Sequence, residues 1–204
     1  MKYRREKSSK FRHIEKELRL KLLTDNEKQE LKDKEGCGLL ALSKNVYHVE
    51  FMCLNKIYKG YGIKNDNGGI EFIDMNDIKE PITIQNHGYI VVSDKKKGNK
   101  KKCCLFFSFP DYLAFLSLRE HHLLRLPDEC DYYIMSSEKN YIPVVIETDE
   151  YEKIYTFFPN NIFGKTIGKT IYERNKKHVI EMNIIYKGNE SLHDFVKEYI
   201  KSIK

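Results

Sequence analysis

The stretch KKCCLFFSFPDYLAFLSL, residues 101–118, decides the fold class of this chain. Residues 103–107 form a short apolar run typical of a buried strand, and residues 111–119 have the apolar spacing of a helix. Ser108 and Asp111, at the junction, have the three-residue spacing of a capping box. The stretch therefore predicts a strand, a tight turn and a helix, the repeating unit of an α/β protein.

The pattern of one strand and one helix continues to the C-terminus. Apolar runs predict three further strands, at residues 131–137, 152–158 and 177–186. Two helices are predicted at residues 165–175 and 187–204, whereas 138–151 is ambiguous because Pro143 would break a long helix. This alternation favours a mainly parallel, Rossmann-like sheet in an α/β domain over residues 103–204. Ligands of such sheets bind beyond the carboxyl ends of the strands.

The preceding part of the chain has a different composition. Residues 45–102 are rich in β-branched and aromatic side chains, and Asn67-Gly68-Gly69 indicates a hairpin because its turn needs positive φ angles. We therefore predict a small antiparallel β unit with a lysine-rich loop. Residues 1–44 are charged around a loose helical stripe of leucines and predict N-terminal helices, the second capped by Thr24 or Asp25. Their charges suit a solvated face or a basic arm on nucleic acid.

Composition limits the class of protein. The chain has 204 residues, of which 41% are hydrophobic, so it is long enough to bury a sizeable core. Its five cysteines form no Cys-x-x-Cys pair, which argues against a disulfide framework or a zinc ribbon and favours buried free thiols. Neither a secretory signal nor a run of about 18 apolar residues is visible, so we expect a cytoplasmic protein that does not enter membranes.

Positive charge is the first indication of a ligand. The net charge is +6, and six lysines occupy one eight-residue stretch: Lys95, Lys96, Lys97, Lys100, Lys101 and Lys102. This loop is either a solvated hairpin tip or a finger that contacts phosphates. Lys165 and Lys169, on the predicted helix after the third strand, are further candidates. Ser137, Asn160 and Asn161 follow strand ends and are able to donate hydrogen bonds to a phosphate.

Four motifs follow one another in an order that resembles a known family. They are GIKNDNGGIE at 62–71, the strand-turn-helix stretch at 103–118, YTFFPNNIFGKTIGKTI at 155–171 and YKGNESLHDFVKEYI at 186–200. The chain resembles, from about residue 45 onward, the C-terminal part of primase-like Toprim proteins carried on mobile elements of Bacteroides-type bacteria. This resemblance implies a Toprim fold. It also implies a site in which one Glu acts as general acid/base and a few Asp residues hold Mg²⁺ for phosphoryl transfer.

The acidic residues of such a site are replaced in this chain. With Asp111 aligned, Phe107 stands at the Glu position, and Pro159-Asn160-Asn161 stands where the family has Asp-x-Asp. Residues 95–110 and 153–172 contain neither Asp nor Glu, so a shift of one or two residues does not restore the acids. Phenyl and amide groups cannot replace anionic oxygens around Mg²⁺. We therefore expect a degenerate Toprim domain with no catalytic residue, no metal and no cofactor.

Three functions compete at this point. The first is a catalytically inactive Toprim-like protein that binds nucleic acid, or another phosphate ligand, through backbone contacts. The second is a protein-interaction or structural module that uses the former catalytic face, lined by Phe107, Phe109, Pro159 and Phe163. The third is an active Mg²⁺-dependent nuclease or primase with differently aligned acids, for which the candidates are Asp111, Asp149, Glu150 and Asp194.

Overall fold

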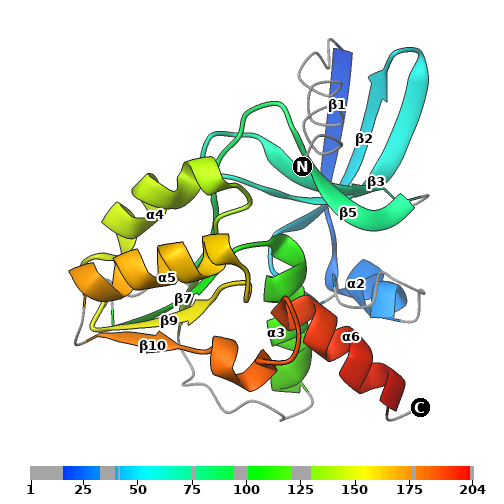
Figure 1. Ribbon diagram of the computed structural model, residues 1–204. Helices are drawn as coiled ribbons and strands as arrows, with labels where there is room; N and C mark the ends of the chain where they lie inside the picture. Colours follow the sequence, from blue (N-terminus) through cyan, green and yellow to red (C-terminus); the bar gives the residue numbers. More distant parts are fainter. Residues whose placement is uncertain are drawn as a thin grey trace. The chain divides into compact units, whose positions relative to one another are not determined.

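The computed structural model describes residues 16–32, 40, 42–74, 77–93, 101–120, 130–175 and 178–202. The chain divides into two compact units, residues 1–88 and 89–204 (Figure 1). These units differ from the three predicted segments, 1–44, 45–102 and 103–204, because strand pairing crosses both predicted boundaries. A strand before residue 44 joins the first sheet, and a strand before residue 102 joins the second. Among the described helices, none is both long and apolar enough to cross a membrane.

The first unit is built on an antiparallel sheet with the strand order β1-β2-β3-β4-β5. Its strands are β1 (Lys16–Leu22), β2 (Val46–Cys53), β3 (Lys56–Lys64), β4 (Ile70–Asp74) and β5 (Asp77–Ile84), and helix α2 (Asp25–Lys32) follows β1. Phe51, Ile70 and Phe72 are buried together on one face of the sheet. This arrangement confirms the predicted antiparallel β unit.

Strand β1 corrects the prediction of a helix over its residues. Leu18, Leu20 and Leu22 are spaced by two, which is the period of a strand, and β1 pairs with β2 along its length. The predicted cap at Thr24 is confirmed. The Glu27 N–H donates to Thr24 Oγ1 (3.3 Å), and the Thr24 N–H donates to Glu27 Oε2 (2.8 Å), so a capping box starts α2.

The predicted hairpin at Asn67-Gly68-Gly69 is present between β3 and β4. Gly68 has a φ of +76°, a conformation that glycine adopts without steric strain. The Asn65 Oδ1 accepts hydrogen bonds from the backbone N–H groups of Gly69 (2.7 Å) and Asn67 (3.1 Å). These bonds close the turn and set the register of β3 against β4.

The turn between β2 and β3 is strained. It consists of Leu54 and Asn55, whose φ angles are 50° and 59°. Positive φ at both central residues defines a type I′ turn, in which Asn-Gly is the favoured pair. A leucine in this conformation brings its Cβ close to the following carbonyl oxygen. The Leu54 side chain is 81% exposed, so burial does not offset the strain.

Replacing Leu54 by asparagine is therefore expected to raise the free energy of unfolding by roughly 0.5–1 kcal/mol, since asparagine tolerates the left-handed region. Urea denaturation measures the change. Ile57→Asn is the matched control, because Ile57 is also exposed but lies in strand β3, where asparagine is disfavoured. A lower urea midpoint for Leu54→Asn than for the unmodified protein would show that the turn is not strained.

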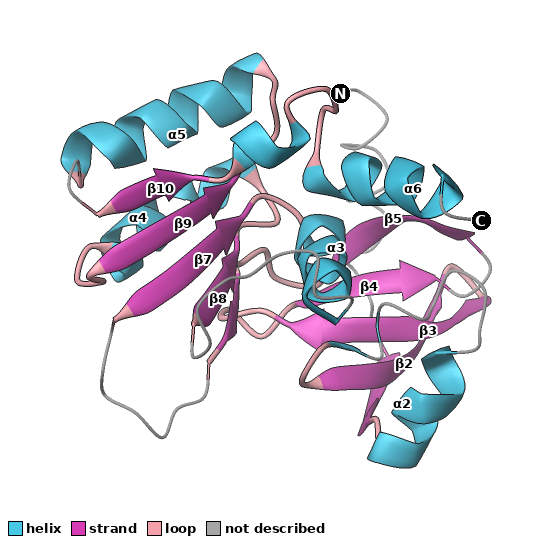
Figure 2. Ribbon diagram, turned by 90° about the horizontal axis from the view of Figure 1, so that it is seen from below, coloured by secondary structure: helices cyan, strands magenta, loops and turns pink. Residues whose placement is uncertain are grey.

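The second unit is a doubly wound α/β domain whose sheet has the order β10-β9-β7-β8-β6 (Figure 2). Its strands are β6 (Ile90–Val92), β7 (Lys102–Phe106), β8 (Asp131–Ile134), β9 (Lys153–Phe157) and β10 (Val179–Glu181). Strands β7 to β10 run parallel, and β6 pairs antiparallel with β8 at the edge. The predicted fold class is confirmed: a mainly parallel α/β sheet preceded by a small antiparallel unit.

Helices cover both faces of this sheet (Figure 1). The helices are α3 (Phe109–Glu120), α4 (Tyr141–Thr148), α5 (Ile162–Arg174) and α6 (Leu192–Ser202). Helices α4 and α5 pack on the face that carries Leu105 and Ile154. On the other face Phe106 stacks on Phe157, with ring centroids 4.9 Å apart, and contacts Phe115 of α3.

Two details of this unit were not predicted. Pro143 lies in the first turn of α4, where backbone N–H groups have no hydrogen-bond partner within the helix. Its lack of an N–H therefore costs no hydrogen bond, and residues 138–151 do contain a helix. The predicted fourth strand is short, because the chain leaves β10 and forms a 3₁₀ turn at η3 (Asn183–Tyr186). The Tyr186 hydroxyl donates to the Phe158 carbonyl (2.9 Å) and holds this turn against the end of β9. The four cysteines in the described part of the chain are buried and form no disulfide.

Candidate functional site

The strand order of the second unit defines where a ligand would bind. The chain passes from β7 to β8 on one side and then to β9 on the other, so the order reverses between β7 and β9. In doubly wound sheets the crevice at this reversal, beyond the carboxyl ends of the strands, is the usual ligand site. Phe107 and Ser108 follow β7 here, and Pro159-Asn160-Asn161 follows β9. These are the positions that the sequence singled out.

Asp111 is committed to a structural role beside this reversal. The Ser108 hydroxyl donates to Asp111 Oδ2 (2.6 Å), and the Asp111 N–H donates to Ser108 Oγ (3.2 Å), as predicted for the start of α3. Asp111 is 3% exposed, and its Oδ1 accepts the backbone N–H of His193 (3.0 Å) in α6. Burial raises the pKa of this carboxyl. Asp111 therefore joins the first turns of two helices distant in sequence.

Asn160 uses its side-chain amide as a donor to the chain itself. Its Nδ2 donates to the carbonyl oxygens of Tyr186 (2.9 Å) and Asn189 (2.8 Å). Its backbone N–H donates to the carbonyl of Glu190 (2.7 Å). An aspartate has no hydrogen to offer these two carbonyls, so the amide is required by the loop between β10 and α6.

Asn161 is the N-cap of α5. Its Oδ1 accepts the Gly164 N–H (2.9 Å), and its Nδ2 donates to Glu190 Oε1 (3.2 Å). Gly164 is needed at this position, since a Cβ would lie 2.0 Å from the Pro159 carbonyl oxygen. The predicted phosphate donors Asn160 and Asn161 thus already hold the end of β9 to its neighbouring segments.

Phe107 stands where the resemblance in sequence would place a glutamate. Its ring meets Phe163 of α5 edge to face, with centroids 5.3 Å apart, and both rings pack against the core. Phe109 is 1% exposed, and Pro159 is buried. The predicted contact surface of four residues is therefore wrong in part: two of its members lie inside the unit, and the other two are half-buried against it.

The residues at the reversal do not fit a Mg²⁺ site. Magnesium is held by anionic or carbonyl oxygens in near-octahedral geometry. Phe107 offers no donor atom, Asn160 directs its N–H groups to carbonyls, and the Asn161 oxygen is bonded to Gly164. Within the described ranges, moreover, no three His, Cys, Asp or Glu side chains are grouped so that they could hold a metal ion.

Of the acids proposed for an active nuclease, Asp111 and Asp194 lie close together at the first turns of α3 and α6, but the other two lie apart from them. Asp111 follows β7 at the carboxyl edge of the sheet, whereas Asp149 and Glu150 precede β9 at the amino edge. Arg174 Nε donates to both Asp149 oxygens (2.8 and 2.9 Å), and the same guanidinium lowers the pKa of Asp149. Asp194 accepts the Ser191 hydroxyl (2.6 Å), which confirms the predicted cap of α6.

The predicted cationic residues are divided between the two edges of the sheet. Lys165 and Lys169 are exposed on α5, beyond the carboxyl edge, and Lys169 lies 3.7 Å from Glu173. Lys101 and Lys102 lie at the start of β7, the amino edge, and strand β7 spans roughly 16 Å. These residues therefore do not form one site. Lys95, Lys96, Lys97 and Lys100 lie outside the described residues.

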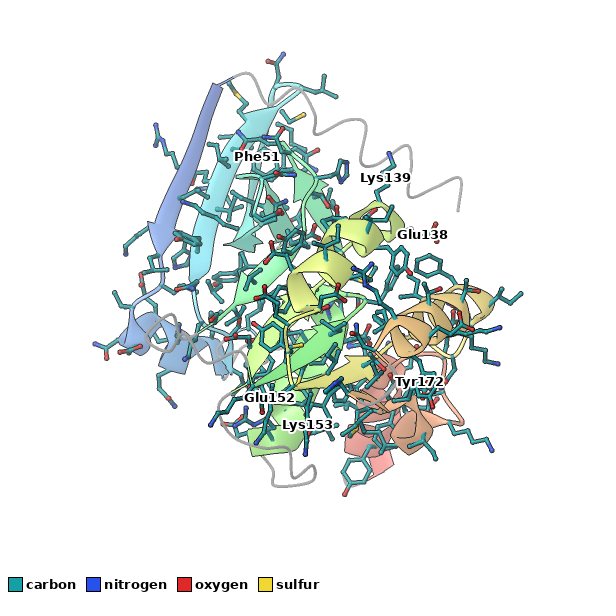
Figure 3. The ribbon with its side chains drawn as sticks, turned by 90° about the vertical axis from the view of Figure 1, so that its left-hand side faces the viewer. Phe51, Glu138, Lys139, Glu152, Lys153 and Tyr172 are labelled. Atoms are coloured by element: carbon teal, nitrogen blue, oxygen red, sulfur yellow. The ribbon has the colours of Figure 1, made fainter. Side chains whose placement is uncertain are left out.

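Ser137 also has a local structural role, as a cap. Its Oγ accepts the N–H of Lys139 (3.3 Å) and caps η2 (Glu138–Asn140) after β8. Figure 3 shows Glu138 and Lys139 at one end of the second unit and Glu152 and Lys153 at the other. Ser137 is thus at the carboxyl edge after β8, which lies on the opposite side of β7 from β9.

A hollow at the carboxyl edge is acidic rather than basic. It has a volume of about 380 Å³ and is lined by Gly188, Asn189, Glu190, Asp194, Lys197 and Glu198. Three carboxylates face one lysine in this lining, so the hollow disfavours a phosphate. Lys101 and Lys102, by contrast, lie at the opposite edge of the sheet.

Two features with a bearing on function were missed from the sequence. Lys153 lies beside Lys102 in the register of β7 and β9, although 51 positions separate them in the chain. The sequence shows Lys153 at the start of a predicted strand, but only the strand order shows that this strand lies next to β7. The other feature is the exposed leucine at the β2–β3 turn, visible in the sequence as an apolar residue between two strands.

Comparison with known proteins yields structural similarities only. No family model and no curated protein matches the chain. The primase fragment of the bacteriophage T7 primase-helicase protein is similar with a TM-score of 0.47 and 12% identity, over 72% of this chain and 61% of the fragment. A T7 structure of primase domains interacting with the lagging-strand DNA polymerase, bound to an RNA/DNA hybrid and dTTP, has a TM-score of 0.40 and 12% identity. That match covers 66% of this chain and 69% of the other.

These similarities concern the arrangement of helices and strands. The chain spans 61% of the T7 primase fragment. Because one fold hosts many activities, an activity has to be argued from the residues of the site.

Proposed function

We propose that this chain is a catalytically inactive, Toprim-like protein that binds nucleic acid through the phosphate backbone. The observation that carries the proposal is the pairing of lysines at the amino edge of the second sheet. Lys102 lies opposite Lys153 in the register of β7 and β9, and the Lys153 N–H donates to the Lys101 carbonyl (2.9 Å). The lysine-rich stretch of residues 95–102 leads directly into this edge.

Electrostatics favour phosphates at this edge. Lys153 is exposed and Lys102 is half-buried, and because they lie directly opposite each other in the register of β7 and β9, their side chains are on the same face of the sheet. Glu152 precedes Lys153 in the chain (Figure 3), and Asp149 at the same edge is paired with Arg174, so the proposed excess of cations rests on the six lysines of residues 95–102. Contacts of this kind bind the backbone with little sequence preference and release counterions, so affinity falls steeply with salt.

The side chains at the reversal support the inactive assignment. Phe107, Asn160 and Asn161 stand where an acidic metal site would need carboxylates, and each is engaged in packing or capping. Asp111, the acid nearest to them in sequence, bonds to Ser108 and His193. A setting on a mobile element, as the resemblance in sequence suggests, is part of the same proposal.

Binding is tested by fluorescence polarisation with labelled single- and double-stranded DNA and RNA over a range of salt. We expect micromolar affinity at low salt. The Lys102→Gln/Lys153→Gln pair is expected to lower the slope of log K against log salt by about 2, since each lost phosphate contact removes about one unit. The control pair Lys165→Gln/Lys169→Gln removes the same charge from α5 and should change the slope by less.

Two results would count against this proposal in different ways. Absence of micromolar binding by the unmodified protein at low salt would reject nucleic-acid binding. An equal or larger effect of the α5 pair would reject the amino edge as the binding surface. Cleavage or primer synthesis that depends on Mg²⁺ would reject the inactive assignment.

A further inference from the structure

The β2–β3 hairpin ends in an exposed apolar tip. Met52, Leu54 and Ile57 are 48%, 81% and 57% exposed, and Met52 lies opposite Ile57 in the strand register. Strand β4 pairs only with the Gly60–Lys64 half of β3, so the part of β3 next to the turn has β2 as its paired neighbour. Phe51 marks this end of the sheet in Figure 3. The tip thus extends beyond the part of β3 that pairs with β4.

The leucine at the tip opposes the stability of its own turn. Leu54 adopts a left-handed conformation in a turn that favours asparagine or glycine, and its side chain is largely in water. Neither local conformation nor core packing explains a leucine there. Backbone strain that the fold does not need is a feature of contact sites, where the side chain is required by a ligand.

Cations flank this apolar tip. On the same face as Met52 and Ile57, Arg19 lies opposite Glu50, which accepts a salt bridge from Lys59 (3.0 Å). Arg19 and Lys59 therefore place two positive charges around one acid. On the other face Lys56 follows the turn directly, with its Nζ 5.1 Å from the centre of the Tyr58 ring. The tip therefore combines apolar side chains with neighbouring cationic side chains.

We propose that the Leu54 tip is a wedge that inserts between base steps of a nucleic-acid duplex, with Arg19, Lys56 and Lys59 on the adjacent phosphates. The inference rests on the proposed function and adds a second nucleic-acid contact to it. Leucine, isoleucine and methionine are side chains that proteins insert between base steps, and one or two such side chains suffice to unstack a step. Phosphates on either side of an opened step match the cations that flank the tip.

The size of the tip favours a duplex over a folded protein partner. A specific protein interface buries about 800 Å² on each partner and 20–30 residues a side. Three aliphatic side chains at one turn are far smaller than that. An anionic membrane surface would also accept an apolar tip with lysines, and the experiment below separates it from a duplex.

The test uses the full-length chain and a DNA duplex that carries 2-aminopurine, whose fluorescence rises when its neighbours unstack. Binding of the unmodified protein is expected to raise this fluorescence. Leu54→Asn should abolish the rise and weaken duplex binding by roughly tenfold, because unstacking is no longer compensated by contact. Ile184→Asn is the matched control, since Ile184 is 73% exposed and lies in the second unit. It should bind and unstack as the unmodified protein does.

The outcomes separate this inference from the proposed function. Duplex binding by the unmodified protein, with the same fluorescence and affinity in Leu54→Asn, would overturn the wedge and leave the lysine surface standing. No duplex binding at low salt would overturn the wedge, and the proposed function would fall with it only if single-stranded DNA and RNA did not bind either. In a parallel arm with phosphatidylcholine–phosphatidylserine vesicles, binding that Leu54→Asn abolishes would identify a membrane contact and overturn the duplex. No binding to the vesicles would support the duplex.

Discussion

Replacing Asp111 by alanine is expected to lower the free energy of unfolding by about 3 kcal/mol, because it leaves buried donors without their acceptor. The backbone N–H of His193 and the hydroxyl of Ser108 both donate to this carboxylate, which is 3% exposed. The change also releases the first turn of α6 from the first turn of α3. Urea denaturation followed by far-UV circular dichroism measures the loss.

The matched control is Asp194→Ala. Asp194 repeats the local geometry of Asp111, accepting the Ser191 hydroxyl (2.6 Å), but it is exposed. We therefore expect a loss of about 0.5–1 kcal/mol, typical of a surface cap. Equal losses for the two variants would show that the bond between Asp111 and α6 contributes nothing to stability.

The Asp111 carboxyl also has a pH signature. Burial raises its pKa in the folded protein, so the unfolded chain releases this proton at a lower pH than the folded chain does. The contribution of the group is therefore fully present below its unfolded pKa of about 3.9 and is lost as pH rises through the folded pKa. The stability of the unmodified protein relative to Asp111→Asn should accordingly fall as pH rises. A relative stability that grows with pH would contradict the raised pKa.

Replacing Asn160 by aspartate is expected to lower the free energy of unfolding by about 2–3 kcal/mol, although an acid at this position is what the family pattern contains. The change removes both side-chain donors and sets a carboxylate against the carbonyl oxygens of Tyr186 and Asn189, now 2.9 and 2.8 Å from Nδ2. A carboxylate oxygen and a carbonyl oxygen with no hydrogen between them repel each other. The urea midpoint measures this loss.

Asn161→Asp is the control for this change. Aspartate is as good an N-cap as asparagine, and a negative charge is favourable at the start of α5. Its single disadvantage is the exposed contact with Glu190, so the expected change in stability is within about 0.5 kcal/mol. If Asn160→Asp were as harmless as Asn161→Asp, the amide of Asn160 would not be what holds the β10–α6 loop.

Much of the second unit could be predicted because its signals are local. A continuous apolar run followed by helical spacing is enough to indicate β7 and α3, and the serine and aspartate of each cap act within one turn. The two asparagines after β9 were also singled out by position alone. Their roles were not, because Asn160 bonds to residues 26 and 29 positions away.

The errors have equally physical causes. A leucine every second residue in β1 suits a strand, but the period becomes decisive only when β2 provides the partner. In the sequence, lysines that precede β7 and asparagines that follow β9 are all candidates for contact with a phosphate. A parallel sheet separates them, since residues that precede a strand and residues that follow one emerge at opposite edges.

Residue types and their order establish an α/β sequence of elements, a phenylalanine and two asparagines where a metal site would need acids, and a surplus of lysine. The roles of those residues depend on their tertiary contacts. The tertiary structure engages Asn160, Asn161 and Asp111 with the chain itself, sets Lys102 beside Lys153 and leaves Leu54 exposed at a strained turn. The physical reason is that residue type and spacing specify local structure, whereas hydrogen-bond partners and neighbouring charges depend on which strands pair.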